Sequence, residues 1–257
     1  MKKNESFLIR HSLPCDDCGS SDAKAEYVNN FYCWSCQKST KKKFNPEDLL
    51  NYQPRNTVTT ESLSDVKFGP ISDAGKVYLY KYFITDKVAK QFKIGSTKEL
   101  EYQGKTYGER LLFPGYINNE LKFIEARALG EQIPKFITLG NKSELFEIEH
   151  PNYPEIVCIV EDMVSAIRLS KFVSVAALRG THLSEKNTIY LLNKYNRCIV
   201  WLDNDAPGKK AAQNMIHRLR WIFKKTVLMS DLEEPKKYPD EVLEDQINNG
   251  INEITKW

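Results

Sequence analysis

The chain has 257 residues, of which 41% are hydrophobic and 28% charged, and its formal net charge is +3. This composition is typical of a soluble globular protein, and no apolar run approaches the roughly 18 residues of a membrane span. The first ten residues lack the apolar stretch of a secretory signal, so we expect a cytoplasmic protein with reduced thiols and no membrane partner. The small net charge does not by itself indicate a nucleic-acid partner.

Four of the six cysteines lie close together near the N-terminus, with the spacing C-x2-C-x14-C-x2-C, at Cys15, Cys18, Cys33 and Cys36. Thiolates three residues apart on a turn converge on one ion, and two such turns complete the tetrahedral set that structural zinc prefers. Residues 1–37 are therefore predicted to form a zinc ribbon holding one structural Zn²⁺. The remaining cysteines, Cys158 and Cys198, lie in apolar runs and are predicted to be buried core residues.

A zinc ribbon does not specify a function, because such modules bind DNA, RNA or protein. Strand-like pieces are expected at Ala25–Val28 and Phe31–Trp34. The aromatic residues Phe31, Tyr32 and Trp34 could stack on bases, or they could form the small core of the ribbon itself.

Residues 38–64 are polar and contain Pro46 and Pro54. This composition predicts a flexible linker, with one short helix after Asn45 and Pro46. The linker begins with the basic run around Lys41–Lys43, which is either a solvated surface or a contact for phosphates.

The chain is continuously globular from residue 65. Between 65 and 150, Gly and Pro turns separate short apolar runs at Val77–Phe83, Leu111–Phe113 and Leu121–Ile124. This pattern predicts a mixed α+β subdomain. From 151 to 257 the pattern becomes regular. Strands are expected at four places, Ile156–Val160, Val173–Leu178, Cys198–Leu202 and Val227–Met229. Helices are expected between them, at Asp162–Phe172, from Ser184, and at Pro207–Phe223. Apolar strands that alternate with helices predict a parallel sheet covered on both faces.

Two of these strands end in acidic residues. Glu161 follows the first strand, and Asp203 and Asp205 follow the third. Ligand sites in open α/β sheets lie at the carboxyl ends of the strands. Three converging carboxylates are suitable ligands for Mg²⁺ or Mn²⁺, and such an ion can neutralise a nucleoside triphosphate. Taken alone, a DxD pair is as well explained by polar residues capping strand ends.

The combination of IVCIVEDMVSAI with IVWLDNDAPGKKAAQN, about 40 residues later, resembles the Toprim module of primases, topoisomerases and related nucleases. The preceding segments YLYKYFITDKVAKQFKIGST, YGERLLFPGYINNELKFIEARAL and PKFITLGNKSELFE follow the order of elements in DnaG-type primase cores. With the ribbon, whose PCDDCGSSD is similar to that of phage primase-helicases, the resemblance spans nearly the whole chain. It implies an α/β Toprim module, at 151–257, preceded by a mixed α+β subdomain, at 65–150, with a separate small N-terminal zinc ribbon.

The resemblance also implies roles for individual residues. Glu161, Asp203 and Asp205 would be the catalytic and metal-binding carboxylates. Basic residues of the middle region and of the helix after DxD would bind nucleotide or template, namely Arg127, Lys135, Lys122, Lys142 and Lys209. Asn30 and Phe31, just before the second cysteine pair, would read template bases.

Two departures from the family pattern concern a second metal ion. The family often has an acid four residues after its glutamate, where this chain has Ser165, although Asp162 is nearby. A later acidic cluster usually resembles KDPDE, whereas this chain has KKYPDE, with Tyr238 at the first acid and Asp240 kept. Asp240 is therefore the weaker metal candidate, and Asp231 is a possible substitute for the missing acid.

The resemblance implies a primase that makes short RNA primers on single-stranded DNA from ribonucleoside triphosphates, in phage DNA replication. No segment offers G-x4-GK[ST], so we expect a separate replicative helicase and DNA polymerase as partners. Two alternatives stay open: a zinc/Toprim recombination mediator that binds DNA without catalysis, and a Toprim nuclease.

Overall fold

The computed structural model describes residues 8–19, 23–27, 30–42, 63–102, 104–229 and 232–256. The chain divides into two compact units, one of Met1–Thr60 with Glu131–Lys135 and the other of Glu61–Gly130 with Phe136–Trp257. Most of the predicted linker, including its short helix, lies outside the described residues. No helix in the described ranges is both long enough and apolar enough to cross a membrane.

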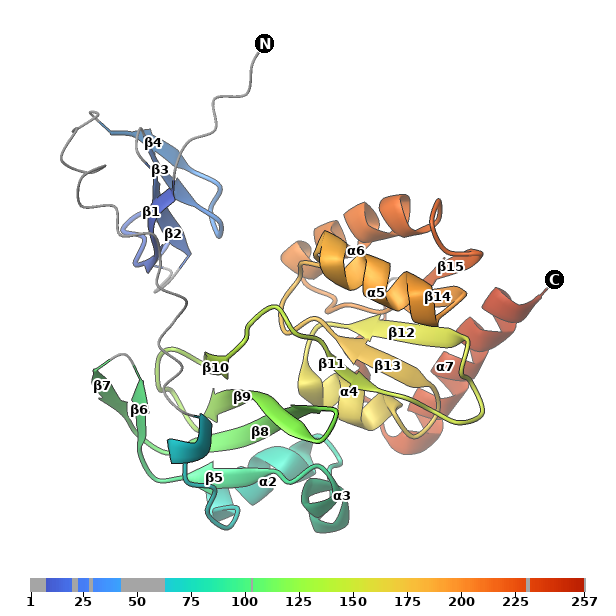
Figure 1. The fold of residues 1–257 in the computed structure, drawn as a ribbon, viewed down its shortest axis with the longest axis horizontal. Coiled ribbons are helices and arrows are strands. Elements are labelled where there is room, and N and C mark those ends of the chain that lie inside the picture. The colour runs from blue at the N-terminus through green and yellow to red at the C-terminus, as the bar shows by residue number, and fades with distance from the viewer. Residues whose placement is uncertain are drawn as a thin grey trace. The chain divides into compact units, whose positions relative to one another are not determined.

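The first unit contains a four-stranded antiparallel sheet in the order β1-β2-β3-β4 (Figure 1). Its strands are β1 (Leu8–Leu13), β2 (Lys24–Tyr27), β3 (Asn30–Cys33) and β4 (Ser39–Lys41). The described part of this unit buries three apolar residues, Cys15, Ala25 and Cys33. So small a core cannot offset the conformational entropy lost on folding, so the unit needs a cross-link or a metal ion.

The second unit begins with an antiparallel sheet in the order β10-β9-β8-β5. Its strands are β5 (Gly95–Thr97), β8 (Arg110–Ile117), β9 (Glu120–Ala128) and β10 (Phe136–Gly140). A hairpin of β6 (Leu100–Tyr102) and β7 (Lys105–Tyr107) lies between β5 and β8. Around the sheet are the short 3-10 helix η1 (Leu63–Asp65) and the helices α2 (Asp73–Lys81) and α3 (Asp86–Gln91). The mixed α+β subdomain is thus confirmed, and the run Val77–Phe83 belongs mainly to α2.

The remainder of this unit is an α/β layer built on a five-stranded sheet in the order β11-β13-β12-β14-β15. The strands are β11 (Phe146–Ile148), β12 (Ile156–Val160), β13 (Ser174–Ala177), β14 (Arg197–Val200) and β15 (Lys225–Leu228). The last four are parallel, as predicted, and β11 adds an antiparallel edge. The helices are α4 (Met163–Leu169), α5 (Glu185–Lys194), α6 (Ala206–Leu219) and α7 (Asp240–Thr255), and the 3-10 turn η2 (Pro235–Lys237) precedes α7. Helix α7 was not predicted from the sequence.

Alternate residues of each parallel strand enter different cores, because successive side chains of a strand point to opposite faces. On one face, Val157 and Ile159 pack with α5 and α6 residues such as Leu191 and Met215. On the other face, on which α4 and α7 lie (Figure 1), Cys158 and Val160 pack with residues of both helices. This second core also contains Leu79, Phe113 and Phe123 of the antiparallel part, so both halves of the unit share one apolar core.

Arg168 on α4 joins three elements of this unit through its buried guanidinium group. The group donates to the Tyr82 carbonyl at 2.7 Å, to the Tyr238 carbonyl at 2.8 Å and to Asp240 Oδ1 at 2.6 Å. The side chain is 1% exposed. The end of α2 and the beginning of α7 are therefore both bound to the last turn of α4.

Replacing Arg168 with Ala would leave buried acceptors unpaired, and we expect the free energy of unfolding to fall by about 3 to 5 kcal/mol. Lys171→Ala is the matched control, because Lys171 Nζ pairs with the same Asp240 carboxylate at 2.6 Å from a more exposed position. Its cost should stay under about 1 kcal/mol. Urea denaturation measures both, and equal costs for the two variants would contradict this role for Arg168.

Candidate active site and metal centre

The four cysteines of the ribbon converge on one point. Their Sγ atoms all lie within 4.8 Å of one another, with Cys15 Sγ 3.9 Å from Cys36 Sγ and Cys18 Sγ 3.7 Å from Cys33 Sγ. A tetrahedral site with Zn–S bonds of about 2.3 Å has sulfur–sulfur edges of about 3.8 Å. A disulfide would bring two sulfurs to about 2.05 Å, so these distances fit a Cys₄ metal site.

The aromatic residues beside this centre differ in their surroundings. Tyr32 and Trp34 pack edge to face, with ring centroids 4.8 Å apart, and Trp34 is 65% exposed. Phe31 is half-buried, and the ammonium groups of Lys24 and Lys42 lie 5.2 and 5.9 Å from its ring centroid. Asn30 Nδ2 donates to Ser39 Oγ at 3.0 Å. The proposed base-reading roles of Asn30 and Phe31 stay predictions.

Removing the metal should unfold the ribbon, because the ion contributes on the order of 10 kcal/mol to folding such a module. We expect Cys36→Ser, or chelation of the ion, to remove the chemical-shift dispersion of the amide NMR signals of residues 8–42. The amide signals of the second unit should keep their dispersion. Cys158→Ala is the control, because the fully buried Cys158 lies in β12 and should leave one zinc ion per chain. Zinc content and the NMR spectrum together test the site, and an intact ribbon without metal would contradict it.

The acidic residues lie where two neighbouring parallel strands end. β12 and β14 are hydrogen-bonded partners, so Glu161, just after β12, and Asp203, three residues after β14, share one edge of the sheet. Burial, reinforced by the Asp203 carboxylate, raises the pKa of Glu161 to about 8. Burial likewise raises the pKa of Asp203 to about 6, with Lys236 opposing the shift. Carboxylates held together in this way favour a proton or a cation between them.

Asp205 begins α6 as well as belonging to the acidic site. Its Oδ1 accepts from the Gly208 amide at 2.7 Å, which is an N-cap hydrogen bond. A Cβ atom at Gly208 would lie 2.2 Å from the Asp203 carbonyl oxygen, so only glycine allows this close approach. The DxD-x-x-Gly spacing thus sets the first turn of the helix directly against Asp203.

The donor set fits a hard divalent cation. It consists of carboxylate oxygens, and the buried Oδ1 of Asn204, between the two aspartates, has no hydrogen-bond partner among the described residues. The carboxylates are less tightly clustered than the thiols: in the described part of the chain, the four cysteines form the only group of three or more His, Cys, Asp or Glu residues placed to hold a metal ion. The roles of Glu161, Asp203 and Asp205 stay predictions.

Lys236 on η2 also belongs to this acidic group, and nothing in the sequence pattern indicates it. Lys236 Nζ lies 2.8 Å from Asp162 Oδ2, 2.8 Å from Glu234 Oε2 and 4.0 Å from Asp203 Oδ2. Its side chain is only 12% exposed. Burial alone lowers the pKa of Lys236, but Asp162 and Glu234 outweigh that effect and raise it above its ordinary value, so the group is an ammonium ion at neutral pH.

The candidates for a second metal site have other partners. Both oxygens of Asp240 are paired, one with Arg168 and one with Lys171. Ser165 Oγ donates to Asp162 Oδ2 at 2.9 Å, and the Tyr238 hydroxyl accepts from the Glu233 amide at 2.9 Å. Asp231 lies outside the described residues. The metal role of Asp240 stays a prediction.

The basic candidates lie in several places. Arg127, on β9, has its guanidinium 4.5 Å from the Phe136 ring centroid and 5.2 Å from that of Tyr78. Lys122 pairs with Glu120. Lys142 and Lys209 are exposed, the latter in the first turn of α6, and the exposed Lys135 directly precedes β10. Their roles in nucleotide or template binding stay predictions.

A second residue that the sequence did not reveal is Arg179, after β13. Its guanidinium lies 3.6 Å from the Phe123 ring centroid and donates to the carbonyls of Asn141, Lys142 and Glu144. The backbone of Arg179 has φ 57°, a left-handed conformation that is uncommon for a residue other than glycine. Arg179 thus binds the 141–144 loop to the end of β13.

Glu125 on β9 is 7% exposed and lies within the electrostatic influence of Arg179, Asp162, Arg127 and Lys236. Burial raises the pKa of Glu125 to about 7, and Asp162 adds to that effect while the cations oppose it. The middle subdomain therefore contributes a buried carboxyl group beside the acidic site.

Because the folded-state pKa of Glu125 lies above its unfolded value, this group stabilises the fold at acidic pH, and the contribution is lost as pH rises through about 7. Between pH 5 and pH 8, wild-type unfolding free energy should fall relative to Glu125→Gln by about 2 kcal/mol. Chemical denaturation at both pH values measures the difference. Parallel pH dependence of the two proteins would show that Glu125 titrates normally.

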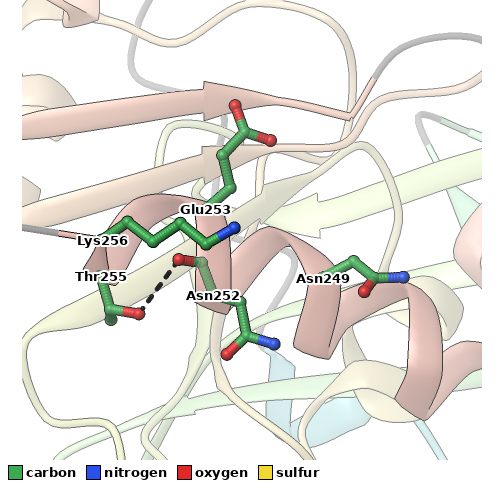
Figure 2. Close-up of a pocket in the computed structure, with 5 residues that line it drawn as sticks. All are labelled: Asn249, Asn252, Glu253, Thr255 and Lys256. Atoms are coloured by element: carbon green, nitrogen blue, oxygen red, sulfur yellow. Dashed lines mark hydrogen bonds between the residues drawn. The ribbon is translucent and has the colours of Figure 1, made fainter.

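A surface hollow lies away from this chemistry, at the C-terminal end of α7 (Figure 2). It is lined by Asn249, Asn252, Glu253, Thr255 and Lys256, and Thr255 Oγ1 donates to the Asn252 carbonyl at 3.3 Å. These residues lie in the second half and at the C-cap of this 16-residue helix, which is about 24 Å long, whereas the turn that carries Lys236 comes before its first residue. The hollow therefore contributes nothing to the candidate active site.

Comparison with known proteins agrees with this architecture. Residues 158–243 match the Toprim-like family model. A DNA primase of Rickettsia bellii is 24% identical over 249 residues, which cover 90% of this chain and 39% of that protein, so the chain spans about two fifths of its curated relative.

Two solved structures share the fold over nearly the whole chain. The zinc-binding and RNA polymerase domains of the Aquifex aeolicus primase superpose with a TM-score of 0.59 at 16% identity, covering 98% of this chain and 80% of that one. The primase fragment of the bacteriophage T7 primase-helicase gives 0.50 at 16% identity, covering 95% and 100%. The resemblance to DnaG-type primases is thus confirmed at the level of the fold, and residues 158–243 form a Toprim-like domain.

Proposed function

We propose that this chain is a DNA-directed RNA primase that joins ribonucleoside triphosphates on single-stranded DNA by metal-dependent nucleotidyl transfer. The observation that carries the proposal is the partly buried carboxyl pair of Glu161 and Asp203 at the ends of adjacent parallel strands. It occurs within a fold shared with primase cores. Phage replication, with a separate helicase and DNA polymerase in the cytoplasm, is the proposed setting.

Glu161, Asp203 and Asp205 would hold Mg²⁺ or Mn²⁺, with Asp240 a weaker candidate for a second ion. A divalent ion bound there supplies positive charge for the triphosphate and orients its α-phosphate. The chain's own part is positional: the N-cap hydrogen bond of Asp205 and the close packing of Gly208 hold the two aspartates in fixed relation.

The basic residues would bind the substrates. Arg127 is the strongest candidate, because its Nε atom is buried without a hydrogen-bond partner among the described residues, and it shares the neighbourhood of the acidic site. Lys122, Lys135, Lys142 and Lys209 would add contacts to phosphate groups. A zinc ion on the four cysteines would hold the ribbon, residues 1–37, whose Asn30 and Phe31 would read the template. The 38–64 segment would connect it to the subdomains at 65–150 and 151–257.

Labelled ribonucleotide incorporation on single-stranded DNA tests the proposal. We expect Asp203→Ala and Asp205→Ala to reduce primer yield at least about 100-fold, because charge stabilisation at the reacting phosphate is lost. Asp245→Ala, on the exposed side of α7, is the control and should retain full yield. Full primer yield from the Asp203 and Asp205 variants would show that the site is wrong.

The same reaction separates the alternatives by its product. Primase activity gives new short RNA, a Toprim nuclease gives shortened DNA, and a recombination mediator retains the DNA without any chemistry. Either of the last two outcomes would overturn the proposed function.

A further inference from the structure

The acidic edge of the parallel sheet contains an internal cation. Five carboxylates gather around the ends of β12 and β14 and the turn before α7, namely those of Glu161, Asp162, Asp203, Asp205 and Glu234. Lys236 Nζ contacts two of them at 2.8 Å and lies 4.0 Å from Asp203, which is a candidate metal ligand. The Lys236 side chain is only 12% exposed, so its ammonium group is part of the site itself.

The position of Lys236 is fixed by its surroundings. Asp162 accepts hydrogen bonds from the Val164 and Ser165 amides as the N-cap of α4, so the carboxylate that Lys236 binds cannot turn away without releasing the helix. Glu234 immediately precedes η2, the turn that carries the lysine. The Tyr82 ring centroid lies 5.8 Å from the ammonium group. The charge is therefore preorganised beside Asp203.

The carboxylates that Lys236 binds are the ones that a second divalent cation beside Asp203 would need. An ion sharing Asp162 or Glu234 with the lysine would lie within a few ångströms of the ammonium group, where two cations repel strongly. The remaining acid nearby, Asp240, is paired with Arg168 and Lys171. Two-metal sites that transfer phosphoryl groups place their ions about 4 Å apart, and here the second such position is next to a fixed positive charge.

We propose that Lys236 is a positioning residue whose ammonium group takes the place of a second divalent cation, so that the acidic site binds one divalent ion per chain. It neutralises part of the carboxylate charge and keeps Asp203 oriented toward the site of the first ion. The number of bound ions follows from the geometry alone, whereas the consequence for primer synthesis rests on the proposed function.

The test is the equilibrium binding of Mn²⁺ to the zinc-loaded full chain, followed by the EPR signal of free Mn²⁺. Wild-type protein should bind one Mn²⁺, and Lys236→Met should bind two, because the released Asp162 and Glu234 carboxylates become available as ligands. Lys237→Met is the matched control. Lys237 is the next residue of the same turn, more exposed and paired with Glu233 and Glu234, and its loss should leave one Mn²⁺ per chain.

Two results would overturn the proposal: two Mn²⁺ ions bound by the wild type, or one ion still bound by Lys236→Met. Lys236→Arg is a second control, because it keeps the positive charge and should still bind one ion. Thermal melting shows whether each variant is folded. A purely structural lysine would lower the melting temperature without adding an ion.

Primer synthesis provides a separate readout. At a Mg²⁺ concentration that saturates the wild type, Lys236→Met should lose about 100-fold in rate, and Lys236→Arg should stay within about tenfold. If the wild type makes no primers while the ion count still rises from one to two, the proposed function fails and the role of Lys236 stands. If primers depend on Asp203 but the ion count never changes, the role of Lys236 fails and the proposed function stands.

Discussion

The mutual repulsion of the carboxylates at the ends of β12 and β14 is the constraint that organises the second unit. Glu161 and Asp203 are held together by strand pairing and partly removed from water, so both carry raised pKa values. An arrangement of this kind is unfavourable unless positive charge is supplied nearby. Lys236 supplies some of it from within the chain, and a bound divalent ion would supply the rest.

Holding such a strained group in place requires a rigid frame around it. The two apolar cores on either side of the parallel sheet fix β12 and β14, and one of them continues into the antiparallel part through Leu79 and Phe113. Buried Arg168 joins α2, α4 and α7, and it binds the Tyr238 carbonyl directly after the turn that carries Lys236. The charge arrangement of the site therefore depends on packing some distance from it.

Much of this could be predicted from the sequence because short-range rules govern it. The strand β12 is a continuous apolar run, and β13 to β15 are short and partly apolar. Glu161 directly follows β12, and Asp203 and Asp205 come within five residues of the end of β14, so parallel pairing brings them to one edge of the sheet. The cysteine spacing is likewise a local property of two turns. Gly208 belongs to the same class, because its role depends on residues only a few positions away.

The missed features depend on contacts between residues far apart in the chain. In the sequence, Lys236 resembles any surface lysine of a polar turn. Its partner Asp162 is 74 positions away, and only the folded chain brings the two together. Arg168 is buried by partners 86 and 70 positions away. The run Val77–Phe83 is rich in aromatic and β-branched residues, yet Ser72 caps a helix there, and Val77 and Tyr80 are exposed. The Ser72 cap and the packing of Leu79 therefore outweigh the strand propensity of these residues.

The chain holds closely spaced acidic ligands together at two places, and it does so in two different ways. In the ribbon, four thiols surround one point and the buried apolar residues are too few to hold the sheet, so the metal must be part of the fold. At the acidic edge, the two apolar cores fix the strands that carry the carboxylates, so their positions do not depend on an ion. The ammonium group of Lys236 lies among these carboxylates. A metal that is part of a fold is retained, whereas a metal added to an existing fold can exchange with its substrate complex. This difference fits a structural role for the ribbon site and the proposed catalytic role for the acidic edge.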